Sequence, residues 1–545
     1  MRSLIWIPVV VSFVLFFWAD AARASGLESG TNGSQSMARP GAFVAKADDA
    51  TAIEHNPAGL AFLRGFHFSL DSNFLHNSTA FQRDGAYPAC PPAAPGSPNC
   101  VDAPYANQRF GNVEDQYGLS WVPQIAAAYG FGRVAVAAGL FGPSSVRGVD
   151  FGENGPLTGG NGVPGPQRYD LIGSDLFVAF PTLAIAARPV DWLSIGVSLH
   201  YAYSHLKFHQ IASTPRYACP SIPNAGGAAG DRGGGDESPV CDVDVKVDAT
   251  DSAGFSATAG FKITPSPNIE LGATVRTQTD IDAEGKLQVI AWLDGPTSVL
   301  RADEPMSPDA KCPGGDAEVM RLQALGQKCA QGTSHIKTLL PWKVRTGGRY
   351  VFRSGEQETG DVELDLVYDR WSAFKAIDVQ LGKVQPRIAA ETNPYINVRV
   401  PHHYEDTYGF RLGGSKRFEM GTRGVEVRGG VSYETAATPV AYTRMDFASW
   451  DKIGVGAGVG VDLVRTDTFR ATLHLGFGLV YLPERKVTDS NVAQTNALDI
   501  DPKVQANPDP PIKNPDRNKQ PLTIVGNGTY TAAFHVFNAG LGIAY

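Results

Sequence analysis

The chain has 545 residues, a formal net charge of −8 and a mean hydropathy of −0.14. This hydropathy is too low for a helical membrane protein, and the mild acidity argues against a nucleic-acid partner. A soluble chain of this length would usually divide into several domains, whereas one large barrel can contain it without a linker. Glycine is abundant, with 60 residues, and Tyr and Phe number 18 and 27. Aromatic girdles are typical of outer-membrane barrels, and glycine lets strands bend and pack against an internal plug.

The first 24 residues (1–24) are expected to be a cleaved signal peptide. An early Arg2 precedes an apolar run at 4–18, and the small residues Ala22 and Ala24 supply a cleavage pattern. A transmembrane anchor is the alternative, but the run is short for a span and no cluster of charges follows it. Export without a later spanning helix predicts a β-barrel in the cell outer membrane.

Residues 65–545 are predicted to form an all-β fold, a 14-stranded antiparallel transmembrane β-barrel with long extracellular loops. Apolar and polar residues alternate in many segments, and Val362, Leu364 and Leu366 share one face of such a segment. Alternation separates lipid-facing from lumen-facing side chains, although a soluble sandwich shows the same local pattern. Short and long connections also alternate, which is typical of an up-and-down barrel. The expected strands are 66–82, 117–131, 133–147, 175–188, 192–210, 244–263, 268–291, 336–353, 361–381, 403–418, 424–437, 451–466, 468–484 and 527–545.

The six cysteines fall into three local groups. Each group of two lies in one polar segment rich in Pro and Gly, so pairing within a loop is the simplest interpretation. Sequence alone does not choose among the 15 possible connectivities, and an oxidising export compartment permits disulfides. Metal binding is the alternative, but no CxxC motif or nearby His cluster supports it, and we expect no metal and no cofactor. The groups are Cys90 with Cys100, Cys219 with Cys241, and Cys312 with Cys329.

The segment between the signal peptide and the first strand, residues 25–64, shows no strand pattern. It is small and polar, and it contains Ala47-Asp48-Asp49-Ala50 and Asn56-Pro57-Ala58-Gly59-Leu60. We expect this compact segment to fold inward as a plug.

These two runs resemble the N-terminal hatch of the FadL family of outer-membrane transporters for long-chain fatty acids and other hydrophobic compounds. The resemblance implies a fourteen-stranded barrel with a small N-terminal hatch, which equals the strand count above. It also implies a capture groove formed by the third and fourth extracellular loops, an internal pocket, and a lateral gap at a kinked third strand. Further blocks that resemble the family, in the same order, are Trp121-Val122-Pro123, Trp371-Ser372-x-Phe374, Glu405-Asp406-Thr407, Arg428-Gly429-Gly430 and Thr438-Pro439.

Two motifs bear on gating and exit. The resemblance implies that Asn56-Pro57-Ala58 ties hatch movement to ligand passage, and a tight turn without gating is the alternative. Asp48 and Asp49 are expected to pair with inward-facing barrel arginines such as Arg428 and so to hold the hatch in place.

Phe141, Gly142 and Pro143 lie where the family has its strand kink. Proline cannot donate to a β-ladder, so inside a strand it implies a bulge or broken pairing. The alternative is that the third strand simply ends at Gly142.

A carboxylate head group would need a cation in the pocket, because an unpaired buried anion is costly. The two basic positions of the family align here with Gln210 and Val400, and the nearby Lys207 and Arg399 are the candidate substitutes. Lys207 shares its parity with outward-facing Tyr203, so it reaches the lumen only if a bulge intervenes.

Met320 and Leu322, in the fourth loop, lie in a short amphipathic pattern that is predicted to cover a groove, and a plain cap on the barrel is the alternative. The third loop, 211–243, is richer in Gly and Asp than a lipid-capturing lip. Without the family's cations, uncharged aromatic or alkane hydrocarbons are an alternative cargo to long-chain fatty acids.

No enzyme is expected, because the sequence has no GxSxG or HExxH motif and no recognisable nucleophile–base spacing. A loop-presenting adhesin or receptor barrel is a third class of function, but an adhesin needs no inward plug. The expected partners are a hydrophobic small molecule or long-chain fatty acid, outer-membrane lipid and lipopolysaccharide, and the barrel is expected to be a monomer.

Overall fold

The computed structural model describes residues 31–89, 104–142, 148–155, 162–213, 237, 242–292, 327–382, 395–421, 423–493 and 523–545. The predicted signal peptide and several other predicted residues lie outside these ranges: Pro143, Met320, Leu322, Cys90, Cys100, Cys219, Cys241 and Cys312. Cys329 and Arg399 lie in described strands, but their side chains are outside the description.

The described part of the chain is dominated by β-strands that belong to one sheet. In chain order they are β1 (Gly65–Asn77), β2 (Ala80–Arg83), β3 (Asn112–Glu114), β4 (Leu119–Gly130), β5 (Val134–Phe141), β6 (Val149–Asp150), β7 (Gly173–Val190), β8 (Leu193–Ser213), β9 (Asp242–Ser266), β10 (Ile269–Arg276), β11 (Thr279–Trp292), β12 (Gln327–Leu340), β13 (Lys343–Ser354), β14 (Gln357–Asp369), β15 (Ala376–Gly382), β16 (Tyr395–Pro401), β17 (Thr407–Met420), β18 (Arg423–Glu434), β19 (Lys452–Arg465), β20 (Arg470–Val487) and β21 (Gly528–Ala544).

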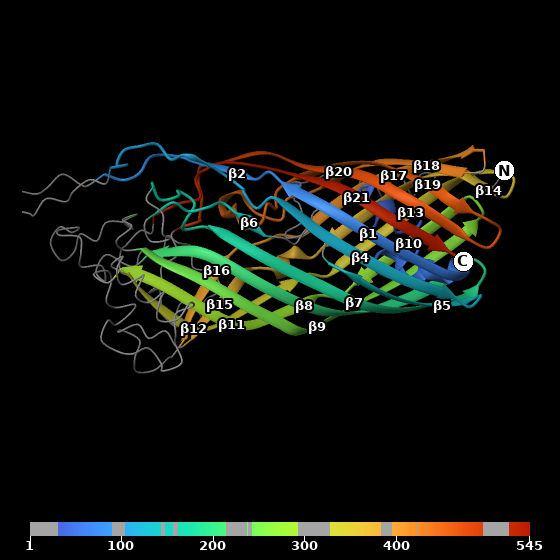
Figure 1. Cartoon of the computed structure of the whole chain (residues 1–545), viewed down its shortest axis with the longest axis horizontal. Coiled ribbons are helices and arrows are strands. Elements are labelled where there is room, and N and C mark those ends of the chain that lie inside the picture. Colours follow the sequence, from blue (N-terminus) through green and yellow to red (C-terminus); the bar gives the residue numbers. More distant parts are fainter. Residues whose placement is uncertain are drawn as a thin grey trace, which may run out of the picture.

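The sheet closes on itself to form a barrel (Figure 1). β1 pairs antiparallel with β21 on one side, from His67↔Ala544 to Asn77↔Phe534, and with β4 on the other. The remaining ladders are antiparallel as well. Several consecutive strands, such as β1 with β2 and β10 with β11, continue one another, so the described sheet is a closed 14-stranded barrel. The predicted fold class and strand number are confirmed.

Side-chain burial along the strands has the period of two that the sequence predicts. On β14, Val362, Leu364 and Leu366 are exposed on the outer face, whereas Glu363 and Asp365 are buried inside. An apolar outer face and a polar lumen distinguish a membrane barrel from a soluble sandwich, whose apolar side chains face inward. None of the helices in the described part of the chain is long and apolar enough to span a membrane.

Two strand boundaries differ from the prediction. β12 begins at Gln327 rather than 336, and β16 (Tyr395–Pro401) lies in what was expected to be a loop. On β12 and its neighbour β11, outward positions carry charged residues such as Lys337 and Asp282. The side chains of both are more than half exposed. Strands that project past the lipid no longer need an apolar outer face, so the alternation that predicts them disappears.

Residues 31–64, called the luminal segment below, lie inside the barrel. They contain three short helices, α2 (Ser34–Met37), α3 (Ala52–His55) and the 3₁₀-helix η1 (Pro57–Phe62). α2 contacts β19, β20 and β21, whereas η1 contacts β4, β5, β7, β8 and β9. Contacts with strands on opposite sides of the wall place the segment across the lumen, where Figure 1 shows it in dark blue behind β1 and β10.

A row of cross-strand glycines makes room for the luminal segment. Gly413, Gly430, Gly456 and Gly478 are successive partners across β17, β18, β19 and β20. A Cβ atom at each of them would lie within about 3 Å of residues 37–40. These four positions therefore form a flat surface on which α2 and its following turn rest, and larger side chains there would displace the segment.

Candidate functional site

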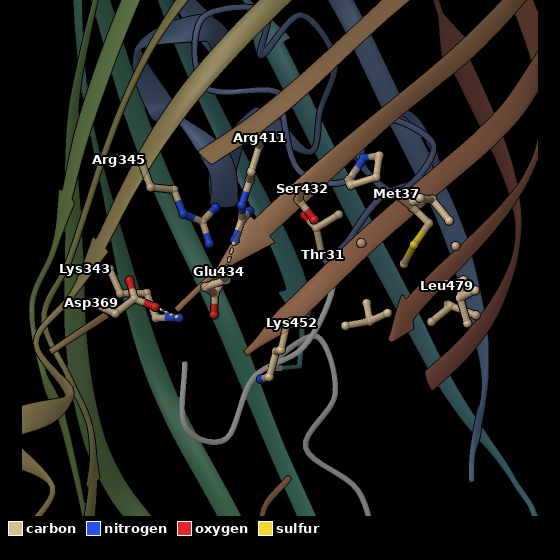
Figure 2. Close-up of a pocket in the computed structure, with 16 residues that line it drawn as sticks. Thr31, Met37, Lys343, Arg345, Asp369, Arg411, Ser432, Glu434, Lys452 and Leu479 are labelled. Carbon is tan, nitrogen blue, oxygen red and sulfur yellow. Dashed lines mark ion pairs between the residues drawn. The ribbon is translucent and has the colours of Figure 1, made fainter. Parts of the chain in front are cut away.

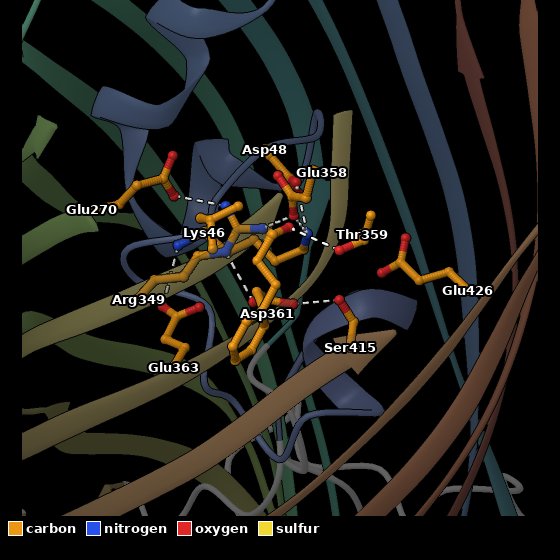
Figure 3. A network of polar contacts seen from close by, with 12 residues as sticks. Lys46, Asp48, Glu270, Arg349, Glu358, Thr359, Asp361, Glu363, Ser415 and Glu426 are labelled. Atoms are coloured by element: carbon orange, nitrogen blue, oxygen red, sulfur yellow. Dashed lines mark hydrogen bonds and ion pairs between the residues drawn. The ribbon is translucent and has the colours of Figure 1, made fainter. Parts of the chain in front are cut away.

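The luminal segment is attached to the wall through acidic residues of β14. Arg39 pairs with Asp361 at 2.7 Å and with Glu363 at 3.0 Å, and all three side chains are fully buried. Asp361 also accepts from Arg349, which in turn pairs with Glu270 at 2.7 Å (Figure 3). A buried charge needs an opposite charge and hydrogen bonds to be tolerated, and this network supplies both.

The same strand also binds the backbone of the luminal segment. The amides of Phe43 and Val44 donate to one carboxylate oxygen of Asp365 at 2.9 and 3.0 Å. The amides of Ala45 and Lys46 donate to Glu363 at 2.7 and 3.2 Å. Alternate residues of one strand point the same way, so three successive inward acids of β14 form a row of acceptors.

The predicted pairing of Asp48 and Asp49 with inward arginines is wrong. Asp48 pairs with Lys46 of the same segment at 2.8 Å, and Asp49 accepts from Gln35. Arg428 pairs instead with Glu426, its neighbour on β18. At the attachment to β14, the wall supplies the acids and the luminal segment supplies the cation and the amides.

His55, at the end of α3, is held neutral inside the barrel. Its Nε2 lies 2.9 Å from the carbonyl oxygen of Asn32, and its side chain is buried. Burial, reinforced by the positive charge of Arg345, lowers the pKa of His55 from 6.5 to about 3.

Asn56, Pro57 and Ala58 form a turn that is pressed against β8 and β9. The Asn56 side chain accepts from the amide of Ala58 at 3.1 Å and donates to the carbonyl of Phe261 on β9 at 3.1 Å. Pro57 is the first residue of η1, where its fixed φ suits a helix start. The predicted motif is therefore both a helix cap and a contact with the wall.

Two paired glycines admit this turn. Gly196 and Gly260 are cross-strand partners on β8 and β9. A Cβ on Gly196 would lie 2.4 Å from the carbonyl carbon of Pro57, and one on Gly260 would lie 2.2 Å from Oδ1 of Asn56. Real Cβ atoms do not approach so closely, so the turn and the two glycines fit only together.

The barrel wall is irregular along its third strand, which β5 and β6 form. Against β7, Phe141 pairs with Phe180 and Val149 pairs with Ser174, so eight steps along the third strand match six along the fourth. The register between the third and fourth strands therefore shifts by two residues between these two described pairs. Phe141 is the last residue of β5, and Gly142 is the last described residue before 148.

The described pairs between the second and third strands stop at the same level, where residues 143–147 lie outside the description. Among the described residues, the β4–β5 pairing ends at Ile125↔Leu140. The two strands meet again where the amide of Gln116 donates to the carbonyl of Asp150 at 2.6 Å. We call the stretch of wall between these two contacts, where the register of the third strand against β7 shifts, the third-strand break.

The luminal segment bridges the two edges of this break from inside. The side-chain amide of Asn32 donates to the carbonyl of Gly142 at 2.6 Å. Its carbonyl oxygen accepts from Gln124 of β4 at 2.7 Å, and Gln124 in turn accepts from the amide of Gly33. One buried side chain of the segment thus connects the end of the β5 strand to β4.

Two apolar clusters occupy the lumen beyond the luminal segment. The first lines one side of the barrel and comprises Leu176, Val178, Phe180, Ala202, Leu206, Val243, Val247, Ala249, Ile281, Ala283, Leu287, Val289, Ile336, Leu340, Trp371, Phe374, Ile377, Tyr404 and Ala437. The second includes Met37, Leu75, Phe81, Val149, Met445, Trp450, Leu482, Tyr530, Phe534 and Val536. Inward apolar surface of this extent is unusual for a water-filled pore, whose interior is polar.

The connection between β18 and β19, residues 435–451, folds inward between the two clusters. Arg444 pairs with Asp170 at 2.6 Å, and His402 lies 2.6 Å from Asp446. Because Asp170 and His402 belong to other connections, these two contacts hold the inward fold in place.

Comparison with known proteins identifies the architecture. A family model described as "Outer membrane protein transport protein (OMPP1/FadL/TodX)" matches residues 15–508. The chain belongs to this family. Its members are outer-membrane transport proteins for hydrophobic compounds, so the predicted resemblance and outer-membrane placement are confirmed at this level. No curated protein matches the sequence significantly.

Solved structures of the FadL/TodX family share the fold. A Pseudomonas aeruginosa FadL homologue is 12% identical, with a TM-score of 0.64, and the match covers 95% of this chain and 99% of that one. The Pseudomonas putida toluene transporter TodX is 17% identical, with a TM-score of 0.56 and coverage of 95% and 98%. The Ralstonia pickettii toluene transporter TbuX is also 17% identical, with a TM-score of 0.54 and coverage of 94% and 98%.

Of the two cations predicted to bind a carboxylate, Lys207 has a described side chain and Arg399 does not. Lys207 is 45% exposed on the outer face of β8, where it pairs with Asp175 at 3.7 Å, so the bulge that it needed is absent from its own strand. Of the two family positions, Val400 packs against the first apolar cluster, and Gln210 donates to the carbonyl of Tyr169. In this FadL/TodX member, Lys207 is therefore not a cation of the lumen.

No sequence pattern indicated a role for Asn32, Gln124 or the Gly196–Gly260 pair. Asn32 and Gln124 are 92 positions apart, and each looks like an ordinary polar residue near a strand or turn. The inward parity of Gln124 on β4 was the one signal available, since a buried amide requires a partner.

Proposed function

We propose that this protein takes up hydrophobic compounds, long-chain fatty acids among them, by passive diffusion sideways into the outer membrane. The observation that carries this proposal is the third-strand break, bridged from inside by Asn32. An apolar tail loses about 0.8 kcal/mol per methylene when it must stay hydrated. A route along apolar clusters that ends at the wall avoids that cost, whereas a water-filled bore does not.

The luminal segment would act as the hatch. It fills the lumen below the two apolar clusters, so a compound that rests on them cannot continue straight through. Movement of the segment would separate Asn32 from Gln124 and Gly142, and the break would then open toward the lipid. Asn56-Pro57-Ala58, pressed on Gly196 and Gly260, is the second contact that such a movement must release.

Uncharged aromatic or alkane hydrocarbons are a second candidate cargo. The positions where the family has cations are Gln210 and Val400 here, and Val400 packs against the first apolar cluster. Such a surface accepts any apolar molecule of suitable size. A loop-presenting adhesin gains no support, because nothing in that function requires a segment bound across the lumen.

The test is uptake of labelled oleate and labelled toluene by cells that lack the protein, with and without a plasmid copy. A Cβ on Gly142 would lie 3.0 Å from the carbonyl of Val178 and 3.8 Å from Val122, so a side chain there enters the break. Gly142→Trp should therefore reduce uptake about tenfold or more, since overpacking costs about 1–3 kcal/mol. Leu140→Trp, on the outer face of the same strand, is the matched control and should behave like the wild type.

Both variants must first show the heat-dependent gel mobility of a folded barrel. Full uptake by a folded Gly142→Trp protein would refute the sideways route. Equal uptake by cells with and without the wild-type protein would refute transport of these compounds altogether.

A further inference from the structure

A polar cavity lies inside the barrel, between the luminal segment and strands β13, β17, β18 and β19 (Figure 2). Its charged lining comprises four basic and two acidic residues: Lys343, Arg345, Arg411, Lys452, Asp369 and Glu434. The lining therefore has an excess of positive charge. None of these residues was predicted as a binding residue from the sequence.

The two arginines are less fully compensated than the rest of the lining. Arg411 is 8% exposed and approaches Glu434 at 3.6 Å, yet its Nη1 atom is buried without a hydrogen-bond partner. Arg345 forms no ion pair with any residue that the structure describes. Figure 2 shows the guanidinium groups of Arg345 and Arg411 converging on the same cavity.

An uncompensated arrangement of this kind is costly unless an anion completes it. A buried donor without a partner and two neighbouring like charges both destabilise the empty site. A guanidinium group binds a carboxylate through two parallel hydrogen bonds, which makes arginine well suited to that ligand. Besides the contact between Arg411 and Glu434, the cavity thus has donors on Arg345 and Arg411 for one more compact oxyanion.

Much of the remaining lining is apolar. Met37, Val455, Leu479, Val480 and Val536 line the same cavity, and Met37 and Val536 also belong to the second apolar cluster. A ligand with its charged end at the arginines would therefore have its hydrocarbon end on this surface.

We infer that this cavity binds the carboxylate of an amphipathic organic anion, with Arg345 and Arg411 at the head group and the apolar lining at the tail. The inference rests on the proposed function and narrows its cargo to compounds with an anionic head. It places head-group recognition on β13 and β17, away from the family positions at Gln210 and Val400.

Arg411 also contacts the luminal segment. Gly41 has a φ of +86°, and a Cβ there would lie 2.2 Å from Nη1 of Arg411, so the guanidinium packs directly on bare backbone. A head group that draws Arg411 away from Gly41 removes part of the surface that supports the segment. Arg411 is thus a positioning residue for the luminal segment as well as a ligand-binding one.

The experiment measures binding of dodecanoate and of dodecanol to the full-length protein in lipid nanodiscs. The two probes share a tail and differ in charge. The wild type should bind dodecanoate about tenfold more tightly than dodecanol. A tenfold difference in affinity corresponds to about 1.4 kcal/mol, and one hydrogen bond to a charged group contributes at least that much. Arg345→Gln should reduce that preference to about twofold and leave dodecanol binding unchanged.

Arg353→Gln is the matched control, since Arg353 lies on the same strand but is exposed near its far end. Arg411→Gln should also lose the preference and, in addition, increase proteolysis of the luminal segment. Equal affinity of the wild type for both probes, or a preference that survives in Arg345→Gln, would overturn the inference. Cell uptake separates the two proposals: uptake of both probes at equal rates overturns only the head-group site, whereas uptake of neither overturns transport.

Discussion

Asn32 is expected to hold the luminal segment over the third-strand break, and Asn32→Ala tests this. The substitution removes two side-chain hydrogen bonds to the wall, to Gly142 and Gln124, and one within the segment, to Glu54. At about 1 kcal/mol net for each bond to the wall, the docked segment loses about 2 kcal/mol. The population of undocked segment should then rise about thirtyfold, since each 1.4 kcal/mol is a factor of ten.

Hydrogen–deuterium exchange of residues 31–64 in nanodiscs measures this free energy directly, and uptake of a fluorescent fatty acid measures its consequence. Both should increase in Asn32→Ala. Gln35→Ala is the control, because Gln35 donates to Asp49 within the segment rather than to the wall. If exchange in Asn32→Ala equals that of the wild type, the bridge does not hold the segment, and the proposed gate is wrong. Faster exchange without faster uptake would instead show that undocking of the luminal segment does not control transport.

Three further predictions concern the same segment. Arg39→Leu leaves Glu363 without its cation and Asp361 with Arg349 alone, and it should weaken docking by about 3–5 kcal/mol, measured by the same exchange experiment. Gly196→Val should displace the turn at Pro57 and speed proteolysis there, whereas Gly429→Val, whose nearest neighbour would lie at 3.6 Å, should have little effect. Because the docked segment keeps His55 neutral to about pH 3, a released segment takes up a proton that the docked one does not. Docking should therefore weaken as pH falls below about 6.5, by about 2 kcal/mol at pH 5, and His55→Gln should abolish this difference.

The barrel could be predicted because its physics is local. Each strand that crosses lipid must alternate in polarity. The face on which Val362 or Glu363 lies can therefore be predicted from the strand alone, without the rest of the fold. The prediction weakened at β12 and β16, where the strands leave the lipid and that requirement ends. Strand existence was therefore predictable, and strand length at the extracellular end was not.

The candidate site was less predictable because its contacts join distant parts of the chain. The position of Gly142 followed from the proline beside it, and the Asn56-Pro57-Ala58 turn followed from the family resemblance. The partners of Asp48 and Asp49 could not be predicted. An acidic pair in the sequence does not show whether the luminal segment or the barrel wall supplies the acids of the contact between them. Arg345 and Arg411 belong to different strands, and only barrel closure brings them to one cavity.

The register shift along the third strand has a consequence for how this protein can vary. It lies between the pairs Phe141↔Phe180 and Val149↔Ser174, within the short connection from β5 to β6. Inserting or deleting residues there would alter the size of the proposed side exit while the remainder of the cylinder kept its shear and diameter. The dimensions of the proposed exit can thus evolve independently of the scaffold, through indels in one short stretch of chain.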